Sequence, residues 1–209
     1  MKKILTLIMA LCFLAPAFGQ NYSKMTEKAQ KKEVKEKMKE YKKKGYDIMG
    51  SRTMEVALVK HYSKLSDLGD NGTVFDGIST RTKSKSLGEQ MALNDATLKY
   101  AQKAGSTVKG RVVSDNFADG TTGEGEFEKF YAAYERLIEQ KVKHALEPSY
   151  SVIKDNGDGT YEIQSFFIVN ESKARIAREQ ALEAALKESE LAGKYGAQIR
   201  AYANDPIEQ

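Results

Sequence analysis

Apolar residues recur at helical spacing in several stretches of this 209-residue chain. Between residues 51 and 68 they lie three or four positions apart, which predicts an amphipathic helix that begins at a capping Ser51. Residues 126–146 carry a wider apolar face and predict a second helix, which Pro148 should end. The alanine-rich segment 171–202 predicts a long last helix that continues past Gly193.

Three segments have the pattern of strands. Residues 150–170 consist of two β-rich runs joined through Asn156-Gly157-Asp158-Gly159, which is typical of a hairpin. Residues 73–84 predict a further strand, which follows a Gly-Asp-Asn-Gly turn. The valine-rich segment 106–117 predicts a fourth strand, because valine favours extended backbone.

Between the last two of these strands, residues 86–105 predict a helix with unusually many alanines. On a turn of 3.6 residues the apolar side chains fall on two lines, while Asp95, Lys99 and Gln102 lie on the solvent-facing side. The first line is Ala92, Ala96, Tyr100 and Ala104, and the second is Leu87, Met91, Leu98 and Ala101. We expect both lines to be buried and the alanines to let the helix axis approach its neighbours closely.

The last predicted helix repeats this arrangement. Its alanines fall along one face, at Ala174, Ala177, Ala181, Ala184, Ala185 and Ala192. Helices outnumber strands and one hairpin is clear, so the pattern favours an α+β fold: a small antiparallel sheet covered by long amphipathic helices. Residues 46–205 are expected to form this single domain.

The N-terminus has the pattern of a secretory signal, assigned to residues 1–19. Lys2 and Lys3 precede an apolar run of about 15 residues, short of the roughly 20 that span a bilayer. Small residues then precede Gln20, as a signal peptidase requires. An uncleaved anchor is the alternative. Cys12, the one cysteine, lies inside this run, so the mature chain should carry neither a lipid nor a disulfide.

Residues 20–45 predict a charged lead helix. The stretch Lys24–Lys44 contains ten lysines and four glutamates, and Val34, Met38 and Tyr41 form a narrow apolar stripe that could rest on a neighbour. Two interpretations of this segment stay open: an exposed, solvated helix, or a basic arm that touches anionic envelope surfaces. The stretch has no arginine and one tyrosine, so nucleic-acid binding is not expected.

Residues that could carry chemistry are few, and we expect no catalytic residue, metal or cofactor. His61 and His144 are the only histidines, and they are too far apart in sequence for a zinc motif. Three loops rich in Asp and Gly, at 67–72, 115–120 and 155–159, could take calcium, although turn geometry explains the same residues. Glu124, Glu126 and Glu128 could serve glycoside hydrolysis, although acids near a helix start are also favoured by the helix dipole.

One resemblance rests on element order and small-residue pattern. The strand before residue 85, the helix SLGEQMALNDATLKYAQKAG and the valine-rich segment resemble the helix-on-sheet unit of LPP-type bacterial envelope lipoproteins and of the N-terminal domain of flagellar assembly protein T. The segment 150–182 is similar to that group's closing hairpin and helix. The resemblance covers roughly Thr73 to Ala192, with a helical insertion at Glu126 to Leu146. This chain lacks the lipidation cysteine, so membrane anchoring is not carried over.

The resemblance implies a periplasmic or outer-membrane-associated accessory protein that works by contacts, and it transfers no site residues. Together with the signal, it favours an exported, non-catalytic protein that binds an envelope protein or its own copies. The alternative is a periplasmic protein that binds or processes a small ligand or glycan through loop carboxylates and tyrosines.

Overall fold

The structure is a computed structural model that describes residues 27–114, 124–193 and 195–202. In chain order the elements are α1 (Glu27–Lys44), β1 (Asp47–Ile48), α2 (Met54–Leu68), β2 (Gly72–Thr82), α3 (Lys85–Ser114), α4 (Glu124–Val142), β3 (Leu146–Asp155), β4 (Tyr161–Asn170), α5 (Glu171–Glu188) and α6 (Gly196–Tyr202). Short 3-10 turns follow α2, α4 and α5. The predicted α+β class is confirmed. The signal segment 1–19 lies outside the described residues.

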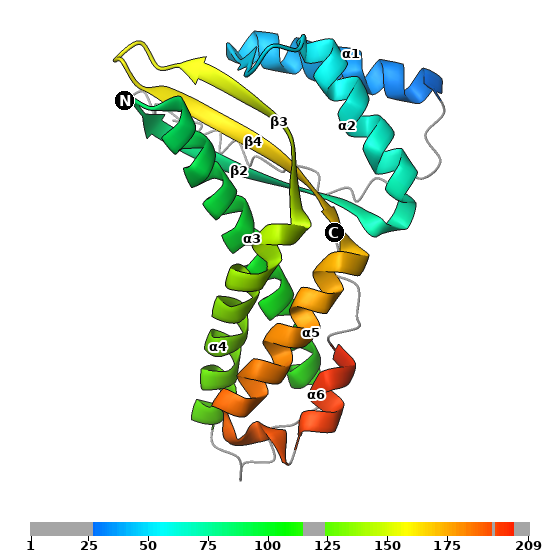
Figure 1. Ribbon diagram of the computed structural model, residues 1–209, viewed down its shortest axis with the longest axis vertical. Coiled ribbons are helices and arrows are strands. Elements are labelled where there is room, and N and C mark those ends of the chain that lie inside the picture. The colour runs from blue at the N-terminus through cyan, green and yellow to red at the C-terminus, as the bar shows by residue number, and fades with distance from the viewer. Residues whose placement is uncertain (1–26, 115–123, 194, 203–209) are drawn as a thin grey trace, which may run out of the picture.

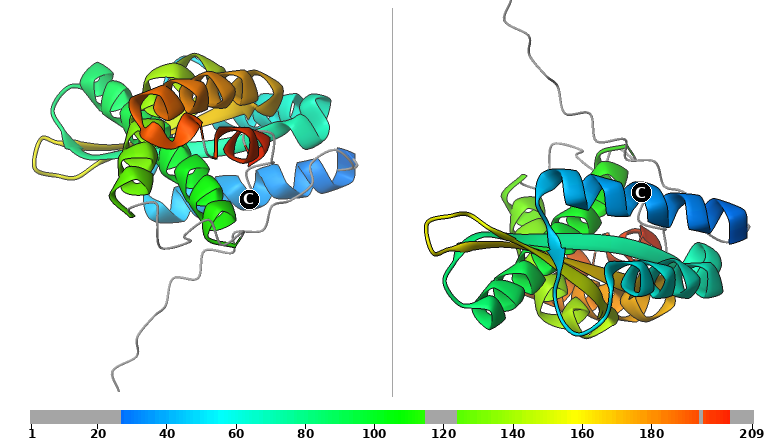
Figure 2. Two further views of the ribbon diagram at one scale, coloured as in Figure 1. Left: turned by 90° about the horizontal axis from the view of Figure 1, so that it is seen from below. Right: turned by 90° about the horizontal axis from the view of Figure 1, so that it is seen from above.

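The four strands form one antiparallel sheet in the order β1-β3-β4-β2. Helices α1 and α2 cover one face of the sheet, and the first half of α3 lies against the other (Figure 1). The second half of α3 extends beyond the sheet and forms a helical bundle with α4, α5 and α6 (Figure 1). Seen from above, α1 runs along the outer surface of the molecule (Figure 2).

The expected hairpin and the expected helix before β2 are both present. Strands β3 and β4 pair over most of their length, and Gly157 and Gly159 adopt positive φ angles in the turn between them. Helix α2 begins two residues later than expected. Its N-cap is Thr53, whose hydroxyl accepts a hydrogen bond from the Val56 N–H at 3.3 Å.

The prediction of a valine-rich strand at 106–117 is wrong. Helix α3 continues through Gly105 to Ser114, and Val108 and Val112 are buried one turn apart against the bundle. Gly105 does not end the helix but lies against α4: an added Cβ would lie 2.4 Å from the Glu135 side chain. Burial between helices therefore overrides the strand preference of valine.

Two element ends also differ from prediction. Helix α4 ends at Val142, and Pro148 lies inside β3 at a register irregularity, where a strand tolerates proline. The last helix is not continuous to Tyr202. Helix α5 ends at the C-cap Ser189, and the separate helix α6 begins at Gly196.

Four of the alanines that were expected to let the helices approach their neighbours closely are fully buried. Ala92 and Ala96 are 0% exposed, as are Ala181 and Ala185. Opposite the first pair, β2 places Gly77, where an added Cβ would lie only 1.7 Å from the Ala92 carbonyl oxygen. Small residues on both elements thus let the helix backbone lie directly on the strand. Of the remaining alanines of the last helix, Ala184 is partly buried and Ala192 is exposed.

The expected second buried line of α3 is not buried. Of its members only Ala101 is buried, whereas Leu87, Met91 and Leu98 are 54%, 44% and 42% exposed. The reason is geometric: the sheet covers the alanine line, whereas α4 packs beside Asn94 and Thr97 and leaves these three side chains about half exposed. The first half of α3 therefore presents apolar side chains to solvent.

The apolar stripe of α1 rests on a neighbour, as expected. Val34 is 3% and Tyr41 2% exposed, and both belong to a second core between α2 and the sheet. The Tyr41 ring stands edge-on to Tyr150 and Phe166, and the Tyr41 and Tyr150 hydroxyls share a hydrogen bond of 2.9 Å. This contact fixes which side of α1 faces outward.

Candidate interaction surfaces

A buried polar network joins α5 to α3 and β2. The Arg178 guanidinium on α5 donates to the Glu171 carboxylate at 2.7 Å and to the Tyr100 hydroxyl of α3. Glu171 also accepts from the Thr73 hydroxyl of β2 at 2.8 Å. Burial alone would lower the pKa of Arg178, but Tyr100 and Glu171 beside it raise that pKa. These groups satisfy one another, so the network serves to join three elements.

The two histidines occupy different environments and do not meet. His61 is buried between α2 and β3, where its Nδ1 lies 2.8 Å from the Ser149 hydroxyl. Burial, with the nearby Lys37 ammonium, lowers the pKa of His61 to about 4. His144 is exposed in the turn after α4. His61 is thus a neutral packing residue in this fold.

The two described loops that were considered for calcium, at 67–72 and 155–159, lie at opposite ends of β2. In the hairpin loop the Asp158 carboxylate accepts hydrogen bonds from Thr160 and pairs with Arg81, which lowers the pKa of Asp158 to about 2. The loop at 67–72 forms the end of α2 and a 3-10 turn. The loop at 115–120 lies outside the described residues. Within the part of the chain that the structure describes, no group of three or more His, Cys, Asp or Glu could hold a metal ion.

Two of the three glutamates considered for glycoside hydrolysis are engaged by lysines. Glu126 pairs with Lys129 at 2.6 Å along α4, and Glu128 pairs with Lys109 of α3 at 3.0 Å. The side chain of Glu124 lies outside what the structure describes. The structure therefore does not bring a pair of free carboxylates together from this group.

The outward side of α3 carries the first surface that could bind a partner. We call Leu87, Met91 and Leu98 the α3 stripe, since they fall within one narrow sector of the helix. Beside it, a polar groove of about 270 Å³ runs between α3 and α4. The groove is lined by Asn94, Thr97, Arg136, Glu139, Gln140 and Lys143. An apolar stripe with a polar rim is the usual composition of a protein contact surface.

Part of the free edge of β2, by contrast, is occupied by side chains of α3. The Ile78 N–H donates to the Asp95 carboxylate of α3 at 2.9 Å. Lys99, which pairs with Asp95 at 2.9 Å, donates to the backbone oxygen of Asp76 at 3.1 Å. Two outward-facing backbone groups are thus occupied, which discourages edge-to-edge association. The sequence predicted only that Asp95 and Lys99 face solvent. They also bind backbone groups of β2, because this edge strand lies next to them.

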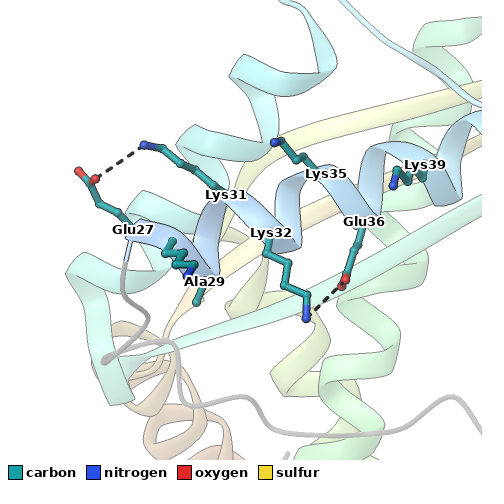
Figure 3. Close-up of a pocket in the computed structure, with 8 residues that line it drawn as sticks. Glu27, Ala29, Lys31, Lys32, Lys35, Glu36 and Lys39 are labelled. Atoms are coloured by element: carbon teal, nitrogen blue, oxygen red, sulfur yellow. Dashed lines mark ion pairs between the residues drawn. The ribbon is translucent and has the colours of Figure 1, made fainter.

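The second candidate surface is the outer side of α1. An open groove of about 980 Å³ follows this helix and is lined by Glu27, Lys28, Ala29, Lys31, Lys32, Lys35, Glu36 and Lys39 (Figure 3). Two ion pairs along the helix, Glu27–Lys31 and Glu36–Lys32, are both 3.8 Å long. Their side chains are largely exposed, so these pairs hold the lysines only weakly.

Comparisons with protein families, with curated proteins and with solved structures found no match for this chain. The resemblance to the LPP-type group therefore stays a prediction, and its valine-rich element is helical here. Among the described residues, no helix is both long and apolar enough to cross a bilayer.

Proposed function

We propose that this chain is an exported, non-catalytic accessory protein of the cell envelope that acts by binding another protein chain through the α3 stripe. The observation that carries the proposal is the exposure of Leu87, Met91 and Leu98, at 54%, 44% and 42%. Exposed apolar side chains gathered on one side of a helix mark contact sites more often than single exposed residues do. The apolar signal-like N-terminus supports the exported location.

The geometry of the stripe supports a specific contact. Its helix is held rigidly, because Ala92 and Ala96 on the opposite side are fully buried against the sheet. Beside the stripe, Lys143 donates to Asn94 at 3.2 Å, and Arg136 donates to Glu188 at 2.7 Å. A partner would therefore meet polar groups at the margin of the apolar surface, as is usual for a protein contact surface.

A pair of matched double variants tests this function. Leu87→Ser with Leu98→Ser removes most of the stripe, while Val56→Ser with Val59→Ser removes two equally exposed valines, 44% and 48%, from α2. Both pairs should leave the free energy of unfolding within about 0.5 kcal/mol of the parent, because all four side chains are at the surface. Light scattering of the tagged full chain measures self-association, and retention from envelope extract measures a different partner.

We expect the parent protein and the α2 pair to form the same complex and the α3 pair to lose it. A strictly monomeric parent that retains nothing would contradict the proposal, and so would equal loss of the complex in both pairs. The alternative of a glycan or small-ligand site receives no support from a specific observation: Tyr41, Tyr100, Tyr134 and Tyr150 are buried in the two cores.

A further inference from the structure

The lysines of α1 are sorted onto one side of the helix. Seven of them fall within a sector of roughly 120° when successive residues advance by about 100°. They are Lys28, Lys31, Lys32, Lys35, Lys39, Lys42 and Lys43. The four glutamates of the helix, Glu27, Glu33, Glu36 and Glu40, lie outside this sector. We call the seven residues the lysine face.

All seven side chains of the lysine face are exposed. Five of them, Lys28, Lys32, Lys35, Lys39 and Lys42, follow one another at alternating intervals of four and three residues. Such a series forms a nearly straight line, about 20 Å long at 1.5 Å per residue. Figure 3 looks onto this side of α1. The sequence shows a basic segment, but only the helix register shows that its charges are aligned.

The lysine face is presented in a fixed direction. Val34 and Tyr41 hold the inner side of α1 in the second core, and the Tyr41 hydroxyl is tied to Tyr150. The helix therefore cannot turn its lysines inward without breaking this packing. The cations also have few internal partners: within the described residues no ion pair or hydrogen bond engages the side chains of Lys28, Lys35, Lys39, Lys42 or Lys43.

We propose that the lysine face is a docking surface for the phosphate-bearing headgroups of an anionic lipid bilayer, which the protein binds peripherally. Clusters of four to eight cations on one helix face are typical of such contacts, and each adds to the attraction near the charged surface. Lysine supplies compact point charges with no need for planar pairing. Stacking on the bases of a single-stranded nucleic acid would instead call for exposed aromatic or arginine groups, which the lysine face lacks.

The contact is electrostatic and superficial. The apolar side chains of α1 point into the second core, so they are not free to enter the hydrocarbon region. The lysine face lies on α1, whereas the α3 stripe lies across the sheet from it (Figure 1). Membrane docking and protein binding are therefore separable, and either proposal can fail without the other.

Substitution tests this proposal better than deletion, because removing α1 would also remove Val34 and Tyr41 from the second core. One variant changes the aligned lysines to glutamine, at Lys28, Lys32, Lys35, Lys39 and Lys42. The charge-matched control changes Lys60, Lys83, Lys103, Lys141 and Lys187 to glutamine. Both keep the full chain and lose the same net charge, so they differ only in where that charge lies.

Flotation with vesicles measures binding. One set contains phosphatidylcholine with about a third phosphatidylglycerol, a second contains phosphatidylcholine alone, and soluble polyphosphate is the competitor. We expect the parent and the control to bind the anionic vesicles at about 0.05 M salt and to be released at about 0.5 M salt. The aligned-lysine variant should bind at least about 100-fold more weakly.

Three results would overturn the proposal. Equal binding to neutral vesicles would show that headgroup charge is not recognised. Equal weakening in both five-lysine variants would show that net charge matters and the lysine face does not. Binding of polyphosphate without any binding to anionic vesicles would assign the lysine face to a soluble polyanion. Circular dichroism of both variants confirms that α1 and the sheet stay folded. The double variant Leu87→Ser with Leu98→Ser should float with the anionic vesicles as the parent does.

Discussion

The two faces of the sheet are covered in different ways. On one face, Ala92 and Ala96 of α3 lie over Gly77 of β2, so that the backbones nearly touch. On the other face, large aromatic rings such as Tyr41 and Tyr150 fill the space beneath α1 and α2. Close packing on the first face requires small side chains, whereas packing on the second face requires large ones. The two faces should therefore respond in opposite ways to changes in side-chain size.

The largest effect is expected from removing a ring on the aromatic face. Tyr41→Ala should lower the free energy of unfolding by about 4 kcal/mol, because it leaves a cavity among Tyr46, Tyr150 and Phe166. Tyr41→Phe keeps the ring and should cost only about 1 kcal/mol, through loss of the hydrogen bond to Tyr150. Urea unfolding measures both values. A cost for Tyr41→Ala below that of Tyr41→Phe would mean that α1 does not dock here.

The next effect concerns pH on the same face. Because burial lowers the pKa of His61 to about 4 in the folded state, from about 6.5 when unfolded, neutral His61 favours folding. This contribution is fully present above pH 6.5 and is lost as the pH falls toward 4, by roughly 3 kcal/mol in all. Unfolding curves from pH 7 to pH 4 measure it.

Two variants isolate the contribution of His61 from that of the carboxylates. His61→Gln should flatten this part of the pH dependence, since it removes the titrating ring. His144→Gln, at an exposed position, is the control. If the two variants gave the same pH profile, the buried state of His61 would be refuted.

The smallest effect is expected at the free edge beside the alanine-lined face. Asp95→Ala leaves the Ile78 N–H without its acceptor and should cost about 1–2 kcal/mol. It should also raise the rate of aggregation, because the edge of β2 becomes available for pairing. Glu89→Ala changes an exposed acid on the same helix and serves as the control. Equal light-scattering time courses for the two variants would count against the edge role.

The alanine-lined face was the easier of the two to predict. Small residues at helical spacing predict close packing wherever they occur: Ala92 and Ala96 are buried on this face, and Ala181 and Ala185 of α5 are buried in the helical bundle. What the spacing could not tell was which of two apolar lines the sheet would cover. Leu87, Met91 and Leu98 are exposed because α4 packs beside them and not over them, and the position of a distant helix is not encoded within α3 itself.

Other differences have a similar origin in tertiary contacts. The segment at Val108 and Val112 has the local preference of a strand, yet it is helical because α4 buries it. Gly105 resembles a helix stop in sequence, but it provides room for Glu135 instead. On the aromatic face, the stripe of Val34, Met38 and Tyr41 predicted a contact. The size of that core depended on partners more than a hundred residues away, such as Tyr150 and Phe166.

The candidate surfaces were predictable to different degrees. The basic character of residues 24–44 is evident in the sequence, and the alignment of its lysines follows once the helix register is fixed. The α3 stripe could not be predicted, because its pattern is the same whether the line is buried or exposed. Only the arrangement of the surrounding helices distinguishes the two cases.

The close approach of α3 to β2 is the central claim, and adding one methyl group tests it most directly. Gly77→Ala would place a Cβ 1.7 Å from the Ala92 oxygen, so it should lower the free energy of unfolding by about 3 kcal/mol. At Gly110 an added Cβ would have no neighbour within 4 Å. Gly110→Ala should therefore raise the free energy of unfolding by up to about 1 kcal/mol, because alanine favours the helix. Opposite signs in urea unfolding are the predicted result. A Gly77→Ala protein as stable as its parent would contradict the account.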